Sequence, residues 1–193
     1  MADITWDLLE TQVQRCQLCS LYKGIHHKVP GQGDRSAPLM LIGEGPGREE
    51  DEQGLAFVGA AGQLLTRMLS AIDLPRERVY ICNVVKCRPP QNRTPLPEEM
   101  EACRIHLRMQ TWLLRPQVIL LLGATAAKAA LGPDTYITRV RGKWIEKNGV
   151  WMLPTFHPSA LLRDESKKPL AWEDMKSLRH KLQELHLYED IYG

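Results

Sequence analysis

Pro38-Leu-Met-Leu-Ile-Gly43-Glu-Gly-Pro-Gly47 is the most informative segment of this chain for its fold. Its first half is a short apolar run, and such a run bounded by turn residues is typical of a strand buried on both faces of a sheet. Its second half is rich in glycine, which lets the backbone turn sharply or approach a ligand closely. The stretch therefore predicts a central strand that leads directly into a candidate functional loop.

The same alternation continues on both sides of this stretch. We expect further strands at 79–84 and 117–123, a hairpin around Asn148-Gly149, and helices at 3–15, 60–72, 97–115, 124–131 and 171–187. Short apolar strands that alternate with helices predict a three-layer α/β/α fold with a central, mostly parallel, four-stranded sheet. We expect one domain over residues 1–193. Because ligands of such sheets bind beyond the carboxyl ends of the strands, the loops after residues 43, 83, 123 and 154 are the candidate sites.

The composition is that of an ordinary globular protein. Hydrophobic residues make up 44% of the chain, and the formal net charge of +2 does not by itself indicate a nucleic-acid partner. The sequence shows no apolar run long enough to cross a membrane and no pattern of a signal peptide at its start. We therefore expect a cytoplasmic monomer with no membrane partner.

Five cysteines in a chain of this kind need an explanation other than disulfides, because the cytosol keeps thiols reduced. Cys16 and Cys19 form a C-x2-C pair, whereas Cys87 and Cys103 lie far downstream. Four such thiolates hold either an iron–sulfur cluster or a structural zinc ion, and the spacing alone does not choose between them. The wide spacing of Cys87 and Cys103 modestly favours a cluster, since a compact zinc finger more often uses two close pairs of cysteines. We interpret Cys82, inside a predicted strand, as core packing.

The glycine-rich loop does not match a phosphate-binding motif, because it lacks both G-K-[ST] and G-x-G-x-x-G. The sequence instead resembles the family 4 uracil-DNA glycosylases, the iron–sulfur branch of their superfamily. Four blocks in sequence order carry the resemblance, together with the four cysteines: Gly43–Gly47, Phe57–Leu65, Asn83–Pro95 and His157–Arg163. A single block is weak support, but the ordered set is specific.

The resemblance implies an enzyme of base-excision repair that flips uracil out of DNA and hydrolyses its N-glycosidic bond, leaving an abasic site. It also implies a structural [4Fe-4S] cluster held by Cys16, Cys19, Cys87 and Cys103. The uracil-binding residues that it implies are Glu44, Gly45, Phe57, Asn83 and His157, of which Glu44, Asn83 and His157 take part in catalysis.

The residue types suit these roles. An aromatic ring such as Phe57 gives an extruded base a face to stack on, and the amide of Asn83 can pair with a uracil edge and reject cytosine. An imidazole at His157 can stabilise the negative charge that develops on the departing uracil. A carboxylate at Glu44 can position water or face the cationic sugar. We interpret the acidic run 49–52 as a solvated loop in which Asp51 has at most an assisting role.

Contacts with DNA are expected from two segments. Ser159, Leu161, Leu162 and Arg163 form a candidate apolar wedge with a phosphate-binding arginine, with a helix start packed on the core as the alternative. In the proline-rich loop, Arg88 and Arg93 are candidate DNA contacts.

Two other functions compete with this hypothesis. The first is a non-catalytic protein that uses the same fold and a metal cluster to bind nucleic acid. The second is a nucleotide-binding transferase built on the glycine-rich loop.

Overall fold

The structure is a computed structural model that describes residues 4–192. Its strands form a single six-stranded sheet in the order β1-β3-β2-β4-β6-β5. The four central strands β3 (Tyr80–Asn83), β2 (Leu39–Gly43), β4 (Val118–Leu122) and β6 (Val150–Thr155) are parallel. They are the four strands that the apolar runs predict.

The two edge strands correct the prediction of a four-stranded sheet. Both β1 (Gln32–Gly33) and β5 (Ile145–Lys147) pair antiparallel with their neighbours, so the sheet is mixed and has six strands. Strand β5 belongs to the predicted hairpin, in which Asn148 and Gly149 both adopt the positive φ angles of a tight turn. Strand β1 is two residues long and has no apolar pattern from which a strand could be predicted.

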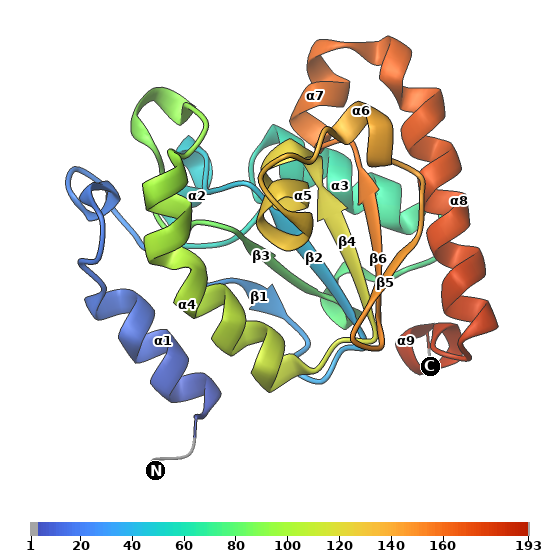
Figure 1. The fold of residues 1–193 in the computed structure, drawn as a ribbon, viewed down its shortest axis with the longest axis horizontal. Coiled ribbons are helices and arrows are strands. Elements are labelled where there is room, and N and C mark those ends of the chain that lie inside the picture. The colour runs from blue at the N-terminus through green and yellow to red at the C-terminus, as the bar shows by residue number, and fades with distance from the viewer. Residues whose placement is uncertain (1–3, 193) are drawn as a thin grey trace.

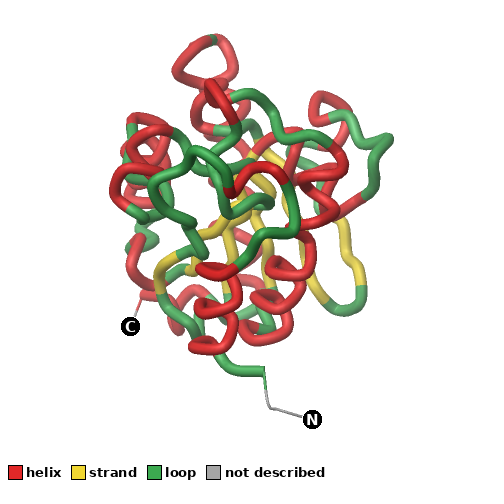
Figure 2. The backbone as a smooth tube through the Cα atoms, turned by 90° about the vertical axis from the view of Figure 1, so that its left-hand side faces the viewer, coloured by secondary structure: helices red, strands yellow, loops and turns green. Residues whose placement is uncertain are grey.

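Helices cover both faces of the sheet, which confirms the three-layer architecture (Figure 1). In Figure 2 the strands lie in the middle of the molecule with helices around them. The helices have these bounds: α1 (Trp6–Arg15), α2 (Arg48–Gln53), α3 (Ala60–Ser70), α4 (Pro97–Leu114), α5 (Gly123–Leu131), α6 (Ile137–Val140), α7 (Pro158–Arg163), α8 (Lys168–Glu184) and α9 (Tyr188–Tyr192). Helix α1 begins with the side chain of Thr5 as its cap, and residue 3 of the predicted helix 3–15 lies outside the described residues.

Strand side chains alternate between two apolar cores. On β2, Leu39 and Leu41 face a core formed with α3, α8 and α9, whereas Met40 and Ile42 face a core formed with α4 and α5. This period of two is the geometry of a strand, and burial on both faces explains why the sequence of β2 is continuously apolar. The sheet is thereby fixed from both sides, and its carboxyl edge carries the connecting loops.

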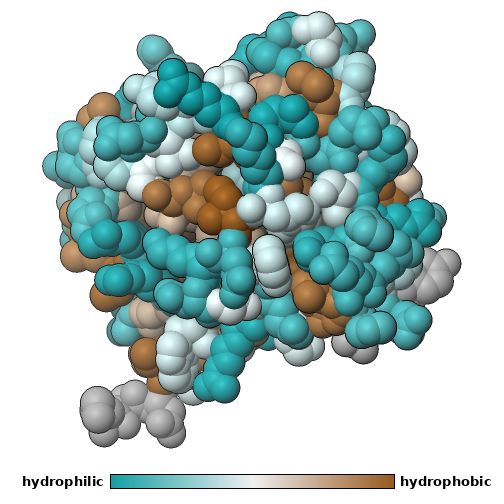
Figure 3. Space-filling model, turned by 45° about the vertical axis from the view of Figure 1, so that its right-hand side comes forward, coloured by the Kyte–Doolittle hydropathy of each residue, from teal (hydrophilic) through white to brown (hydrophobic). Residues whose placement is uncertain are grey.

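The outer surface is mainly hydrophilic on the face that Figure 3 shows, with hydrophobic patches set among polar residues. Between residues 4 and 192, none of the helices combines the length and the apolar character that crossing a bilayer requires.

Candidate active site

A cavity of about 790 Å³ lies at the carboxyl edge of the parallel strands. The loops that follow β2, β3, β4 and β6 all contribute to its wall, as the topology predicts. The structure brings together Glu44, Phe57, Asn83 and His157, which lie far apart in the sequence, on this one cavity. Gly45, Arg88, Arg93, Ser159, Leu162 and Arg163 also line it.

Two glycines leave the space that these side chains occupy. A Cβ atom on Gly43 would lie 2.4 Å from Cζ of Phe57 and 2.5 Å from Oδ1 of Asn83. Gly123 has a φ of +90°, and a Cβ there would lie 2.9 Å from Cβ of His157. Larger residues at either position would therefore push the walls of the cavity apart.

Phe57 closes one side of the cavity from a strained position. Its φ of 54° is in the left-handed region, which is uncommon for a bulky side chain and is often found at functional sites. The ring is buried, and its centroid lies 5.7 Å from that of the His157 imidazole with the planes inclined by 33°. The aromatic face is thus held beside the imidazole.

The buried carboxylate of Glu50 holds the Phe57 loop in place. It accepts hydrogen bonds from the main-chain N–H groups of Val58 at 2.9 Å, Gly59 at 2.8 Å and Gly47 at 3.0 Å. A carboxylate that satisfies three main-chain donors fixes their relative positions. Glu50 therefore ties the glycine-rich loop after β2 to the loop that carries Phe57.

The acidic run 49–52 is not the solvated loop that we predicted from its charge. It forms α2, in which Glu50 and Asp51 are both buried. Asp51 accepts from the main-chain N–H of His26 at 2.9 Å and lies 2.8 Å from its Nδ1. Asp51 does not line the large cavity, so it organises the loop after the first cysteine pair instead.

Asn83 ends β3 with its side chain facing the cavity. The residue is only 2% exposed, and its Oδ1 atom has no hydrogen-bond partner among the described residues. A buried carbonyl oxygen without a partner is costly, and such an atom in a pocket wall is a natural acceptor for a ligand N–H.

His157 begins α7, and its local contacts fix its tautomer. Nδ1 accepts from the main-chain N–H of Ser159 at 3.2 Å, so the neutral ring carries its proton on Nε2. Burial, together with the positive charge of Arg163, lowers the pKa of His157 to about 4. The ring is therefore a neutral N–H donor near pH 7.

Glu44 follows β2 and is anchored by a residue of α5. The buried hydroxyl of Thr125 on α5 donates to Oε2 of Glu44. This contact leaves the other carboxylate oxygen for a further partner.

The segments expected to contact DNA are only partly exposed. In α7, Leu161 is buried against Phe156 and Ala171, whereas Leu162 is 45% exposed. Of the predicted wedge, the structure thus leaves Leu162 as the exposed apolar side chain. Leu161 packs inward because adjacent residues of a helix point about 100° apart, so that the two leucines face different directions.

The two arginines of the proline-rich loop already have partners. Arg93 forms a bidentate ion pair with the buried Glu99, with N–O distances of 2.7 and 2.8 Å. Glu99 also accepts from the N–H of Leu96 at the start of α4. Nε of Arg88 donates to Oδ1 of Asn92 at 2.7 Å. Both arginines reach the cavity rim while bracing this loop.

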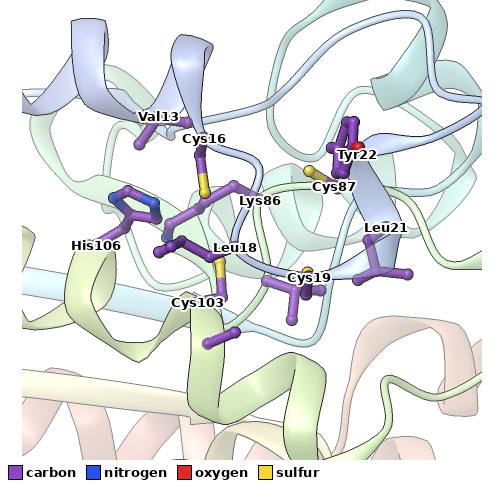
Figure 4. A pocket seen from close by; sticks show the side chains of 12 residues that line it. Val13, Cys16, Leu18, Cys19, Leu21, Tyr22, Lys86, Cys87, Cys103 and His106 are labelled. Atoms are coloured by element: carbon purple, nitrogen blue, oxygen red, sulfur yellow. The ribbon is translucent and has the colours of Figure 1, made fainter.

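The four cysteines of the predicted ligand set line a second, small pocket (Figure 4). Cys16 and Cys19 follow α1, Cys87 follows β3, and Cys103 lies on α4. All are free thiols, and burial together with the neighbouring Cys103 and Cys19 raises the pKa of Cys87 to about 12. Within residues 4–192, no three His, Cys, Asp or Glu side chains form a group that could hold a single metal ion. Cys82, by contrast, is fully buried inside the sheet.

The chemistry of this donor set fits an iron–sulfur cluster. Buried thiolates repel one another unless a cationic centre compensates them, and the irons of a cluster would supply that positive charge. Each thiolate of a cubane cluster binds a different iron, so its ligands stand farther apart than the ligands of one ion. Among the residues that the structure describes, neither ring nitrogen of His106 in the same pocket has a hydrogen-bond partner, and such orphaned polar atoms suit a polar group at the centre.

Sequence patterns did not point to Glu50, Thr125, Lys86 or His106 as residues of these two sites. Each is an ordinary residue type in a helix or loop, and its relevance comes from partners far away in the chain. The sequence did offer one signal for Lys86. It lies between Asn83, predicted for the uracil site, and Cys87, predicted for the metal site.

Comparison with known proteins gives a consistent family. The model of the Uracil DNA glycosylase superfamily matches residues 30–176. A Type-4 uracil-DNA glycosylase of Thermotoga maritima is 46% identical over 164 residues, covering 84% of this chain and 85% of the relative. Those of Archaeoglobus fulgidus and Saccharolobus solfataricus are 42% and 38% identical, covering 93% and 97% of this chain and 92% of each relative. The chain therefore belongs to the type-4 uracil-DNA glycosylases, within the uracil DNA glycosylase superfamily.

Proposed function

We propose that the large cavity receives a uracil flipped out of DNA, and that this uracil-DNA glycosylase hydrolyses the N-glycosidic bond there to leave an abasic site. The single observation that supports this use of the cavity most strongly is the buried Oδ1 of Asn83 in its wall, which has no hydrogen-bond partner within residues 4–192. Base extrusion costs a few kcal/mol, least for a mispaired base, and this cost is recovered by contacts that a flipped base alone can make.

Recognition of uracil rests on stacking and on one amide. The Phe57 ring offers a face for the pyrimidine, and Oδ1 of Asn83 accepts the N3–H of uracil while the amide nitrogen donates to O4. Cytosine presents an acceptor at N3 and a donor at its 4-amino group. Oδ1 of Asn83 would then face another acceptor, and the amide nitrogen would face another donor. A site built around such hydrogen bonds rejects the wrong analogue by roughly 10⁴-fold.

His157 stabilises the leaving group. When the C1′–N1 bond breaks, its electron pair goes to the uracil, where the negative charge is spread over the carbonyl oxygens. The Nε2–H of the neutral imidazole donates a hydrogen bond to O2, and this hydrogen bond becomes stronger as the negative charge develops. The low pKa of His157 keeps the ring a hydrogen-bond donor instead of a proton source.

Glu44 acts on the sugar side of the bond. Its carboxylate, oriented by Thr125, accepts a hydrogen bond from a water molecule whose oxygen adds to C1′ of the cationic sugar. The same negative charge stabilises that cation electrostatically. The water proton passes to the carboxylate, so the products are an abasic site and the uracil anion, which takes up a proton from solvent after release.

The pH dependence tests the state of His157. Because its pKa is lowered to about 4, the imidazole is expected to stay neutral from pH 8 down to about pH 5. In ¹⁵N NMR, the ring should show a protonated Nε2 and a bare Nδ1 across this range. A titration midpoint near the ordinary value of about 6.5 would contradict the assignment.

The lowered pKa of His157 also affects the free energy of unfolding. Unfolded histidine binds a proton near pH 6.5, whereas folded His157 does so near pH 4. As the pH falls through this window, the unfolded state therefore binds more protons, and the contribution of His157 works against the folded state.

We further propose that Cys16, Cys19, Cys87 and Cys103 hold a [4Fe-4S] cluster with a structural role. Such a cluster cross-links the segment after α1, the loop after β3 and helix α4, and it supplies no step of the hydrolysis. The support is the shared pocket of the four thiols and the chemistry of that donor set.

Metal analysis tests this cofactor directly. Protein purified under nitrogen should be brown and contain about four irons and four sulfides per chain. A colourless protein with one stoichiometric zinc ion would show that the thiols serve a different metal.

DNA binding follows from the position of the cavity. We propose that Leu162, with Ser159 and Arg163 near it, meets the strand next to the extruded base, and that Arg88 and Arg93 face phosphates at the rim of the cavity. We also propose that the protein acts as a monomer. Five free thiols suit a reducing compartment such as the cytoplasm.

An alkali-cleavage assay tests the proposed function. A DNA strand with one uracil is incubated with the enzyme and then heated in alkali, which breaks the strand at abasic sites. Cleavage at the uracil is expected, and a strand with cytosine at that position is the control. An intact uracil strand at stoichiometric enzyme would favour the non-catalytic nucleic-acid-binding alternative.

A further inference from the structure

Lys86 is a buried cation in an unusual position. It lies between Asn83, at the end of β3, and Cys87, and it is only 2% exposed. Its Nζ donates to the main-chain oxygen of Asn83 at 2.5 Å and to Oε1 of Gln110 at 2.6 Å. Among the ion pairs of residues 4–192, none includes Lys86. A buried ammonium with only neutral partners is costly, so a negative partner is expected nearby.

The geometry leaves a donor for such a partner. An ammonium has three N–H bonds, and two of them are accounted for by Asn83 and Gln110. Lys86 lines the small pocket together with the four cysteines. The residue thus lies beside the sulfurs.

His106 is the second group in this pocket without a suitable partner. It lies three residues after Cys103 on α4, which places both on the same face of the helix. The imidazole is 3% exposed, and neither ring nitrogen has a hydrogen-bond partner in the described part of the chain. In Figure 4 the ring lies beside Lys86 and the Cys16 and Cys103 side chains. In either tautomer it carries at least one N–H that remains to be used.

We propose that Lys86 and His106 stabilise the negative charge of the cysteine-bound cluster, Lys86 as a buried cation and His106 as an N–H donor to a cluster or cysteine sulfur. The inference rests on the [4Fe-4S] cluster proposed above, since a cubane with four thiolates is an anion. N–H donors and positive charge around the sulfurs are known means by which proteins tune such clusters.

Lys86 also connects the two sites of the protein. The ammonium that faces the cysteines holds the main-chain oxygen of Asn83, whose side chain lines the large cavity. Gln110 extends the connection, because its amide donates to the hydroxyl of Tyr80 at 2.9 Å and to the main-chain oxygen of Pro30 at 2.6 Å. Lys86 is therefore a positioning residue for the end of β3 as well as a partner of the cluster.

The experiment uses the intact holoenzyme purified under nitrogen. Lys86→Met removes the charge with little change of shape, and His106→Leu removes the donor, whereas His106→Gln retains an N–H. Lys181→Met is the matched control, because the ammonium of Lys181 is also largely buried but lies 4.3 Å over the Trp151 ring, away from the cysteines. The readouts are iron and sulfide content, the rate at which the visible absorbance is lost to a chelator, and the reduction potential.

We expect Lys86→Met and His106→Leu to lose the cluster at least about tenfold faster than the wild type, as substitutions around metal ligands commonly do. His106→Gln and Lys181→Met should resemble the wild type. The potential of Lys86→Met should shift to a more negative value, because the reduced cluster carries additional negative charge. If Lys86→Met does not fold, the comparison of His106→Leu with His106→Gln decides the question.

Unchanged cluster lifetimes in Lys86→Met and His106→Leu would overturn the inference, as would a zinc protein without iron. These results are separate from the test of the proposed function. Uracil release by the wild type with unaltered cluster lifetimes in the variants would refute the inference alone. A wild type that retains its cluster but releases no uracil would refute the proposed function alone.

Discussion

Replacing His157 with alanine is expected to slow uracil release about 10²- to 10³-fold under single-turnover conditions, the usual cost of losing a preorganised donor to a developing anion. The loss should appear in the chemical step, because the donor contributes most when the uracil carries negative charge. The variant should unfold at nearly the wild-type temperature, since the side chain lies at a cavity wall.

His180→Ala is the matched control for this variant. His180 is exposed on α8 and does not line the cavity, so its replacement should leave the rate within about twofold of the wild type. A near-normal rate for His157→Ala would remove the imidazole from the mechanism.

Replacing Asn83 with alanine is expected to lower kcat/KM for uracil release by about 10²- to 10³-fold. The amide is proposed to pair with both N3–H and O4, and its loss leaves two polar atoms of the extruded base unpaired in a buried site. The measurement is single-turnover release over a range of enzyme concentrations, which separates binding from chemistry.

Asn92→Gly serves as the control for an asparagine of the same cavity, because glycine tolerates the φ of 56° at this position. Asn92 is exposed at the rim, where its Oδ1 accepts from Arg88, so its loss should change kcat/KM by less than about fivefold. Equal effects of the two substitutions would show that Asn83 has no special role in recognising uracil.

The parallel core of the fold could be predicted from the sequence because its signals are local. A continuous apolar run such as 38–43 indicates a strand buried on both faces, whatever the rest of the chain does. Strand β1 could not be predicted in this way, because Gln32 and Gly33 join the sheet only by pairing with β3. Edge strands of two residues have no period that a sequence pattern can reveal.

The acidic run 49–52 shows that charge alone does not predict whether a residue is exposed to solvent. Charged residues are usually solvated, but Glu50 is buried because three main-chain N–H groups from two loops converge on it. Asp51 is buried because the His26 segment folds over it. Neither set of partners is adjacent in the chain, so the burial follows from the tertiary structure.

In the active site too, features set by local sequence could be predicted, whereas those set by tertiary contacts could not. The positions of Glu44, Asn83 and His157 at strand ends could be expected from topology, and Phe57 from the family motif. The contact of Thr125 with Glu44 could not, because these two residues are 81 positions apart. Leu161 and Leu162 are neighbours of the same type, and only the packing of α7 shows which one is buried.

A crystal structure of the protein with free uracil, the product of the reaction, tests the proposed site. The ring is expected to stack on Phe57, with N3–H pointing to Oδ1 of Asn83 and O2 within hydrogen-bond distance of Nε2 of His157. Uracil bound elsewhere, or bound in this cavity with its edge turned away from Asn83, would refute the proposed site.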